Sequence, residues 1–279
     1  MRTRGNGTGQ IRLAGIAGIV ASIAWLIGDI LLLGKPVASP GDHPLLTGYD
    51  GTAADSLAAM MSASTTRLAW GALLGVLTGP LYLVACGHLY QGLRPARRSL
   101  SLPPFLLLTA GFALAPFAHG SFFYWGQAAK VVDASGVRSA ALDALPGDMA
   151  DVLILPYAVL LTCWVLGSVW MSVCVLRGAT AFPRWMCAVN PLTCIPVGAL
   201  VAASMPGPVG TAIQGAQLSI GNLLLFSLST FALWNARGGA PADRASRSER
   251  PARLAGGHDP QEGRDREGDG GREDEERRP

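Results

Sequence analysis

Residues 13–34 read LAGIAGIVASIAWLIGDILLLG and carry a single charged side chain, that of Asp29. A helix needs about 20 apolar residues to cross the roughly 30 Å hydrocarbon core of a bilayer. The stretch is long enough to do so, and it exceeds the apolar core of a cleaved signal peptide, which has about 7–15 residues. We therefore expect residues 13–34 to form a retained, membrane-spanning helix.

Five further apolar stretches follow along the chain, separated by gaps that contain Pro, Gly and charged residues. They cover residues 67–91, 104–126, 150–176, 185–205 and 213–236. Half of all residues are hydrophobic and 15% are charged, whereas a soluble domain carries about 25% charged residues. The prediction is an all-α, polytopic bundle of six transmembrane helices formed by residues 1–237.

The basic residues predict the direction of these helices, because cytoplasmic loops carry an excess of Lys and Arg. Arg residues gather before the first stretch, between the second and third, between the fourth and fifth, and after the sixth: Arg2, Arg4, Arg12, Arg94, Arg97, Arg98, Arg177, Arg184, Arg237, Arg244, Arg247, Arg250 and Arg253. The alternate loops, 35–66 and 127–149, hold more Asp than basic residues, and loop 206–212 is uncharged. We expect a plasma-membrane (inner-membrane) protein with both termini in the cytoplasm.

Residues 238–279 differ from the rest of the chain. Gly, Arg, Asp, Glu and Pro dominate this segment, and Leu254 is its only large apolar residue. Such a composition cannot bury enough apolar surface to offset the entropy of ordering. We expect a disordered cytoplasmic tail, and the sequence leaves open whether it binds a partner or is only a solvated extension.

Two short helices are expected in the longer loops. In 52–64, Leu57, Met60 and Met61 share one helical face, and 137–145 has a similar pattern. Each segment is interpreted as a connector with one apolar side, or as a cover over a cavity.

Asp29 is the only acidic residue well inside a predicted span. Charged side chains at membrane depth face the bundle interior or a water-filled cavity, and they mark functional sites. Two interpretations remain open for this carboxyl group. In one, it pairs with Arg67 and locks the first two helices together. In the other, it is a catalytic or ligand-binding acid, and His119 is the second candidate catalytic residue.

Other polar and aromatic side chains map to the same half of the bilayer, because successive spans alternate in direction. The candidate binding residues are Trp25, Arg67, Tyr82, Phe123, Tyr124, Tyr157, Gln214, Gln217 and Asn222. Together they predict a polar pocket with an aromatic rim that opens toward the outside. The alternative is that these polar groups only join helices through hydrogen bonds, as isolated polar residues in membranes often do.

Motifs of soluble enzymes are missing from the sequence. It contains no phosphate-binding loop, no H-E-x-x-H, no G-x-S-x-G and no Asp-rich pair for magnesium diphosphate. The five cysteines lie in apolar runs without a C-x-x-C spacing. We therefore expect no metal and no cofactor, and the absence of a basic patch argues against nucleic acid as a partner. The bilayer itself and an apolar small molecule are the expected partners, and the sequence does not indicate an oligomeric state.

Three short motifs carry a resemblance to a known group of proteins. They are Ile27-Gly28-Asp29, the stretch from Arg67 to Gly79-Pro80, and Gly221-Asn222. With these motifs, residues 10–237 resemble bacterial multi-pass membrane proteins that are classed as a domain of unknown function. Arg also far outnumbers Lys, which occurs only at Lys35 and Lys130, as expected from a GC-rich bacterial genome. The resemblance implies a membrane location and supplies no activity.

Three classes of function fit these observations. The first is a membrane protein that binds an apolar small molecule or lipid in the predicted pocket. The second is a membrane-embedded acid–base enzyme, of the isoprenoid or lipid cyclase or isomerase type, that uses Asp29. The third is a proton-coupled transporter or a regulatory membrane partner. The sequence leaves open whether the protein is an enzyme.

Overall fold

The computed structural model describes residues 6–34, 43–136, 139–178 and 180–234. These residues form α-helices and short 3-10 helices, and no strand occurs among them, so the all-α prediction is confirmed. In chain order the elements are α1 (Asn6–Leu33), η2 (Pro44–Gly48), α2 (Gly51–Met61), α3 (Thr65–Leu93), α4 (Arg98–Ser135), α5 (Ala140–Leu176), η3 (Arg184–Ala188), α6 (Pro191–Ser204), α7 (Gly207–Ile213), η4 (Gln214–Ala216) and α8 (Gln217–Leu233). The predicted tail, 238–279, lies outside the described residues.

The helices α1, α3, α4 and α5 are each long and apolar enough to cross a membrane. Large apolar side chains on these helices are exposed, among them Leu77 (70%) and Leu155 (69%). Backbone groups in hydrocarbon have no water to bond, so a spanning segment satisfies them internally as a helix. Length, composition and exposed apolar surface together indicate a membrane-embedded protein.

The last two predicted spans are shorter in the structure. The stretch 185–205 is divided between η3 and α6, and α6 has 14 residues, which gives a helix of about 21 Å at 1.5 Å per residue. Within the stretch 213–236, residues 214–233 form η4 followed by α8, which has 17 residues. The number of six membrane crossings therefore stays a prediction.

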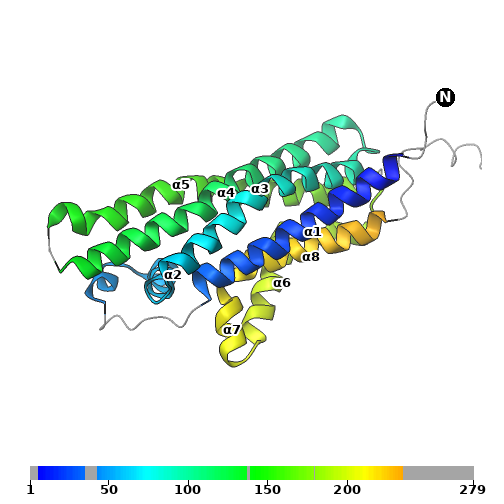
Figure 1. The fold of residues 1–279 in the computed structure, drawn as a ribbon. Helices are drawn as coiled ribbons and strands as arrows, with labels where there is room; N and C mark the ends of the chain where they lie inside the picture. The colour runs from blue at the N-terminus through cyan, green and yellow to red at the C-terminus, as the bar shows by residue number, and fades with distance from the viewer. Residues whose placement is uncertain (1–5, 35–42, 137–138, 179, 235–279) are drawn as a thin grey trace, which may run out of the picture. The chain divides into compact units, whose positions relative to one another are not determined.

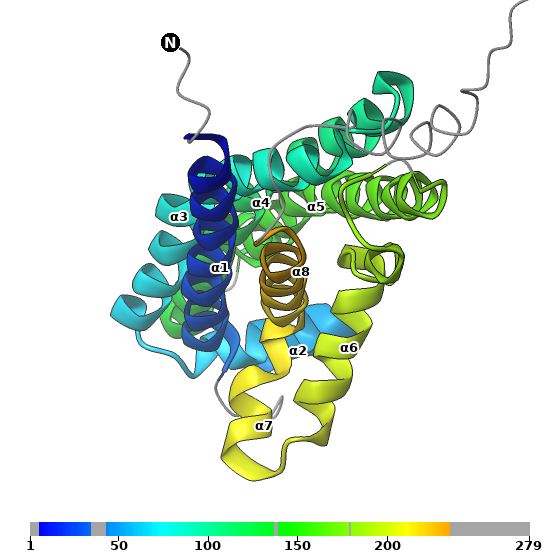
Figure 2. The same ribbon diagram turned by 90° about the vertical axis from the view of Figure 1, so that its right-hand side faces the viewer.

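The arrangement of the helices is visible in two views. In Figure 1, α1, α3, α4 and α5 run alongside one another, and α8 lies along α1. The main packing pairs are α1 with α3, α3 with α4, α4 with α5, α1 with α8, and α6 with α8. In both views α7 lies on the side away from α4 and α5, joined to the other helices through α6 and η4 (Figure 2).

Local sequence signals account for where these helices start and stop. Ser64 and Ser139 accept hydrogen bonds from backbone amides in the first turns of α3 and α5. Asn190 and Thr193 bond to each other's backbone amides in a capping box at the start of α6. Gly136 ends α4 with a φ of 60°, a left-handed conformation that glycine adopts without strain.

The predicted helix in 52–64 is confirmed as α2. Leu57 and Met60 on its predicted apolar face are fully buried. Met60 packs against Gly126 of α4, where a Cβ atom would lie 3.0 Å from the methionine sulfur. His43 Nδ1 lies 2.7 Å from Asp133 Oδ2, a hydrogen bond that ties the same region to α4. Residues 140–145 of the second predicted helix form the start of α5 and not a separate element, and residues 137 and 138 lie outside the described part of the structure.

Candidate functional site

The Asp29 carboxyl group has two partners from two different helices. One oxygen, Oδ2, accepts a hydrogen bond of 2.6 Å from the Ser219 hydroxyl of α8. The other, Oδ1, lies 3.4 Å from Nδ1 of His119 on α4. The two side chains of this pair are 13% and 5% exposed, so it lies almost entirely inside the bundle.

The hydrogen bonds of His119 restrict where its protons lie. Its Nε2 atom is 3.0 Å from the Gly71 carbonyl oxygen. A carbonyl oxygen only accepts, so Nε2 carries a hydrogen and donates it. The remaining nitrogen, Nδ1, then faces Asp29. A neutral imidazole and an ionised carboxylate would place lone pairs against each other there. The favourable arrangements hold one proton between the two residues, either on the carboxyl group or as an imidazolium beside a carboxylate.

Glycines make the space for the imidazole ring. A Cβ atom at Gly75 of α3 would overlap the ring of His119, and one at Gly28 of α1 would lie 3.0 Å from Nε2. On another side the ring of Trp25 lies against the imidazole, with centroids 4.7 Å apart. His119 of α4 is thus held by two other helices, α1 and α3, and its position depends on small residues in both of them.

Arg67 does not pair with Asp29, so that interpretation of the sequence is wrong. Its guanidinium donates hydrogen bonds to the backbone carbonyls of Leu31 at 2.8 Å and of Ile30 at 2.6 Å. These carbonyls belong to the last turn of α1, and the Ile30 carbonyl also accepts a hydrogen bond from the Gly34 backbone amide at 3.0 Å. Arg67 therefore caps α1, and Ser219 and His119 are the partners of the carboxyl group.

A cavity of about 70 Å³ lies beside the Asp29–His119 pair, between α1, α4, α5, η4 and α8. Its walls are formed by Trp25, Asp29, Leu32, Leu33, Ala115, Ala118, His119, Phe122, Tyr157, Leu160, Trp164, Gly215, Leu218, Ser219 and Asn222. Ligand cavities in proteins are mostly apolar with a few convergent polar groups. This cavity has that composition, because four of its polar residues, Asp29, His119, Ser219 and Asn222, come from three helices.

The walls of the cavity divide into a buried part and a partly exposed rim. Trp25, His119, Ser219 and Asn222 are at least nine-tenths buried. By contrast, Leu33, Phe122, Tyr157 and Leu218 are only partly buried hydrophobic residues. Three polar side chains, those of His119, Ser219 and Asn222, therefore lie inside, Asp29 is 13% exposed, and the rest of the partly exposed lining is largely hydrophobic.

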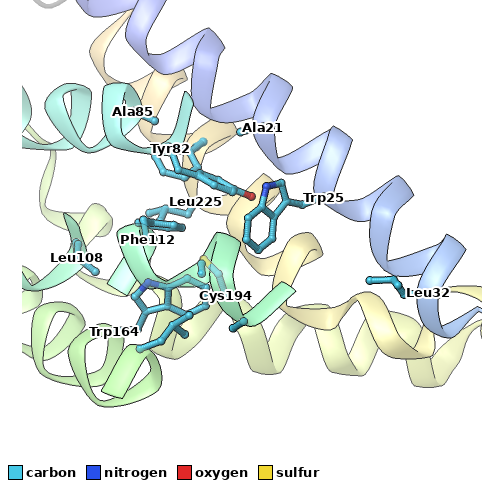
Figure 3. Packing of buried hydrophobic residues seen from close by; sticks show 14 of the residues in the cluster. Ala21, Trp25, Leu32, Tyr82, Ala85, Leu108, Phe112, Trp164, Cys194 and Leu225 are labelled. Carbon is cyan, nitrogen blue, oxygen red and sulfur yellow. The ribbon is translucent and has the colours of Figure 1, made fainter. Parts of the chain in front are cut away.

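A second polar cluster lies next to the cavity, around the fully buried Tyr82. Its hydroxyl donates a hydrogen bond of 3.2 Å to Ser22 on α1, which in turn donates to the Gly18 carbonyl at 2.8 Å. The Trp25 ring meets Tyr82 edge-on at 5.3 Å, and Figure 3 shows its nitrogen on the side of the Tyr82 hydroxyl. Tyr82 thus supports the wall of the cavity without lining it.

The chain matches one family model over residues 1–236, that of the family of unknown function DUF6796. The chain belongs to the family DUF6796. No curated protein and no solved structure matches it. The resemblance to a family of unknown function, stated from three short motifs, is therefore confirmed.

In this DUF6796 chain, the structure brings five of the predicted site residues together at the cavity. They are Trp25, Asp29, His119, Tyr157 and Asn222. Phe123 and Tyr124 lie outside the lining, in edge-to-face contact at 5.3 Å, and Tyr124 is 65% exposed. Gln217, at the start of α8, is half-buried and is not part of the lining. The side chain of Gln214 lies outside the described part of the structure.

Several lining residues of the DUF6796 cavity have no distinguishing signal in the sequence. Ser219 lies one turn before Asn222 on α8, which is the signal that could have found it, since residues three apart share a helix face. Phe122, Leu160 and Trp164 complete the apolar wall. Residues of these types are common throughout membrane helices, and only the packing of the helices shows that these three line the cavity.

Proposed function

We propose that this protein binds an apolar small molecule or lipid, with the polar end of the ligand beside Asp29 and His119. One arrangement carries the proposal: a cavity whose wall holds four polar side chains, Asp29, His119, Ser219 and Asn222, and whose partly exposed rim is largely hydrophobic. Polar groups inside a membrane are costly, and they are retained where they meet a ligand or a partner. An apolar rim suits a molecule that arrives from the surrounding lipid.

The exposed surface near the rim supports entry from the bilayer. Ile154, at 67% exposure, lies on α5 one turn before Tyr157 of the rim. Side chains of this kind are stable against lipid tails, so the helix face beside the rim is suited to contact with hydrocarbon. A ligand dissolved in the bilayer would then reach the cavity without passing through water.

Native mass spectrometry of the detergent-purified full chain tests this proposal. We expect a specific bound molecule, retained through purification. Leu160→Trp, in the cavity wall, should remove it by filling the space, whereas Val159→Trp, at a position 43% exposed on the same helix, should not. Equal retention in both variants, or no bound molecule in the unmodified protein, contradicts the proposal.

The Asp29–His119 pair favours a second candidate, a membrane-embedded acid–base enzyme acting on an isoprenoid or another lipid. A carboxyl group that shares a proton with an imidazole can protonate an alkene or epoxide, and the rings of Trp25 and Trp164 in the wall would stabilise the resulting cation. Asp29→Asn is expected to abolish turnover of the molecule that co-purifies with the protein. Full turnover by this variant rules the enzyme out.

The proposed setting is the plasma membrane, with six crossings and both termini in the cytoplasm. The support is the distribution of Arg, which is concentrated in the segments that would face the cytoplasm. In this orientation Asp29 lies about five residues, or roughly 7 Å, from the outer end of α1. The cavity would then belong to the outer half of the bilayer.

A further inference from the structure

Two polar atoms in the cavity wall near Tyr82 have no hydrogen-bond partner in the described part of the chain. They are the Trp25 indole nitrogen, a donor, and the Asn222 side-chain oxygen, an acceptor. The residues are 7% and 1% exposed. A buried polar group without a partner costs about 1–3 kcal/mol, so each of the two atoms indicates a missing partner.

The two atoms also belong to the same part of the cavity. The nitrogen edge of Trp25 lies on the side of the Tyr82 hydroxyl (Figure 3), and the Asn222 side chain lies close to the same hydroxyl. A second unpartnered indole nitrogen in the cavity wall, that of Trp164, packs instead against Gly111 of α4. The open positions beside Tyr82 are therefore one donor and one acceptor.

We infer that the ligand is a long-chain or isoprenoid-type alcohol whose hydroxyl group binds between Trp25 and Asn222. A hydroxyl group both donates and accepts, so it would donate to the Asn222 oxygen and accept from the Trp25 indole. This inference rests on the proposed function, since it names the ligand class for the same cavity.

The electrostatics of the wall disfavour charged head groups. No Lys or Arg is among the lining residues in the described structure, so a carboxylate or phosphate would be buried there without a counter-charge. Arg67 is held by the carbonyls of Ile30 and Leu31. The Asp29 carboxyl already accepts from Ser219 and faces His119, so an ammonium group would have to displace these partners.

The size of the cavity determines how much of the ligand's hydrocarbon chain it can enclose. About 70 Å³ holds a hydroxyl group and the first few carbons and not a whole lipid, since cavities that enclose drug-sized ligands measure about 300–1,000 Å³. The remaining carbons would extend over the apolar rim at Leu33, Phe122 and Leu218 toward the bilayer.

The test compares four probes that share one chain and differ only in the head group. The full-length protein is placed in phosphatidylcholine nanodiscs that contain hexadecanol, hexadecanoate, hexadecylamine or hexadecane at equal mole fraction. Bound probe is then counted by native mass spectrometry. We expect hexadecanol to be retained in preference to the other three probes.

Two conservative variants test the assigned atoms. Asn222→Leu removes the acceptor and keeps the branched shape of the side chain, Trp25→Phe removes the donor and leaves a smaller aromatic ring, and each should weaken hexadecanol binding by about three- to tenfold. Thr230→Val is the matched control, because the Thr230 hydroxyl is buried and unpartnered on the same helix but lies outside the cavity lining. Thermal unfolding in the nanodisc checks that each variant is folded.

The possible failures separate the two proposals. Equal retention of hexadecane and hexadecanol, or a preference for hexadecanoate or hexadecylamine, overturns the assignment of an alcohol and leaves an apolar ligand in place. Unchanged hexadecanol binding in both cavity variants overturns the role of Trp25 and Asn222. If none of the four probes is retained, the assignment of an alcohol is again excluded. The proposed binding of an apolar molecule is then tested separately, by whether a specific molecule co-purifies with the protein.

Discussion

Ser219 donates a hydrogen bond of 2.6 Å to Asp29 and so joins the last turns of α1 to the first turn of α8, across 190 residues of sequence. The same carboxyl group faces His119 of α4. One acidic side chain therefore connects three helices at the point where the cavity lies. Its partners are polar residues of the bundle, whereas Arg67 donates its hydrogen bonds to backbone carbonyls of α1.

Ser219→Ala should destabilise the protein. The substitution leaves Oδ2 of Asp29 without its partner in a buried position, and orphaning a buried acceptor costs about 1–3 kcal/mol. The free energy of unfolding in mixed detergent micelles measures the effect. Ser204→Ala is the control, because that exposed hydroxyl bonds only to carbonyls of its own helix, and it should change the stability little. Equal effects of the two substitutions would mean that the Ser219–Asp29 bond does not stabilise the bundle.

Gly75→Ala should also destabilise the protein, because the new methyl group would overlap the His119 ring. Overpacking of this kind costs about 1–3 kcal/mol. The matched control is Gly87→Ala on the same helix, where nothing lies within 4 Å of the added carbon. There the higher helix propensity of alanine should leave stability unchanged or raise it by up to about 1 kcal/mol. Thermal unfolding of both variants gives the comparison, and a Gly75→Ala protein as stable as the control would contradict the packing described for His119.

The sequence predicts depth in the membrane better than it predicts which side chains meet. Counting residues from the helix ends places Asp29 and His119 in the same layer, because the rise per residue is fixed. The rotation of each helix about its axis is not available from such counting. Arg67 and Ser219 lie in the same layer by this measure, and only packing shows that Ser219 reaches the carboxyl group.

Adjacent aromatic residues show the same limit. Phe122, Phe123 and Tyr124 follow one another on α4, and successive residues of a helix point about 100° apart. The orientation of α4 turns Phe122 to the cavity and Tyr124 outward. The stretch 185–205, predicted as one span, is interrupted at Asn190, where a capping box starts α6; this box depends on the Thr193 side chain.

Arg67→Met should lower the stability of the bundle and leave the Asp29–His119 pair in place. The guanidinium bonds two carbonyls in the last turn of α1, where a positive charge is also favourable to the helix dipole, and losing it should cost about 1–2 kcal/mol. Arg94→Met, at an exposed position after α3, is the control and should be nearly neutral. Unfolding in detergent gives the two values. A loss of ligand binding in Arg67→Met without a loss of stability would show that Arg67 acts on the site and not on α1.

Labelling from one side of the membrane tests the proposed topology. Ala134→Cys, exposed near the end of α4, should react with a membrane-impermeant maleimide on intact cells, because the loop that follows is expected outside. Arg94→Cys, exposed between α3 and α4, should react only after the membrane is opened. The unmodified chain is the control, since three of its five cysteines, Cys86, Cys174 and Cys194, are buried and thiols in apolar surroundings are inert. The reverse pattern of labelling would show that the protein has the opposite orientation in the membrane. The cavity beside Asp29 would then face the lipids of the cytoplasmic leaflet.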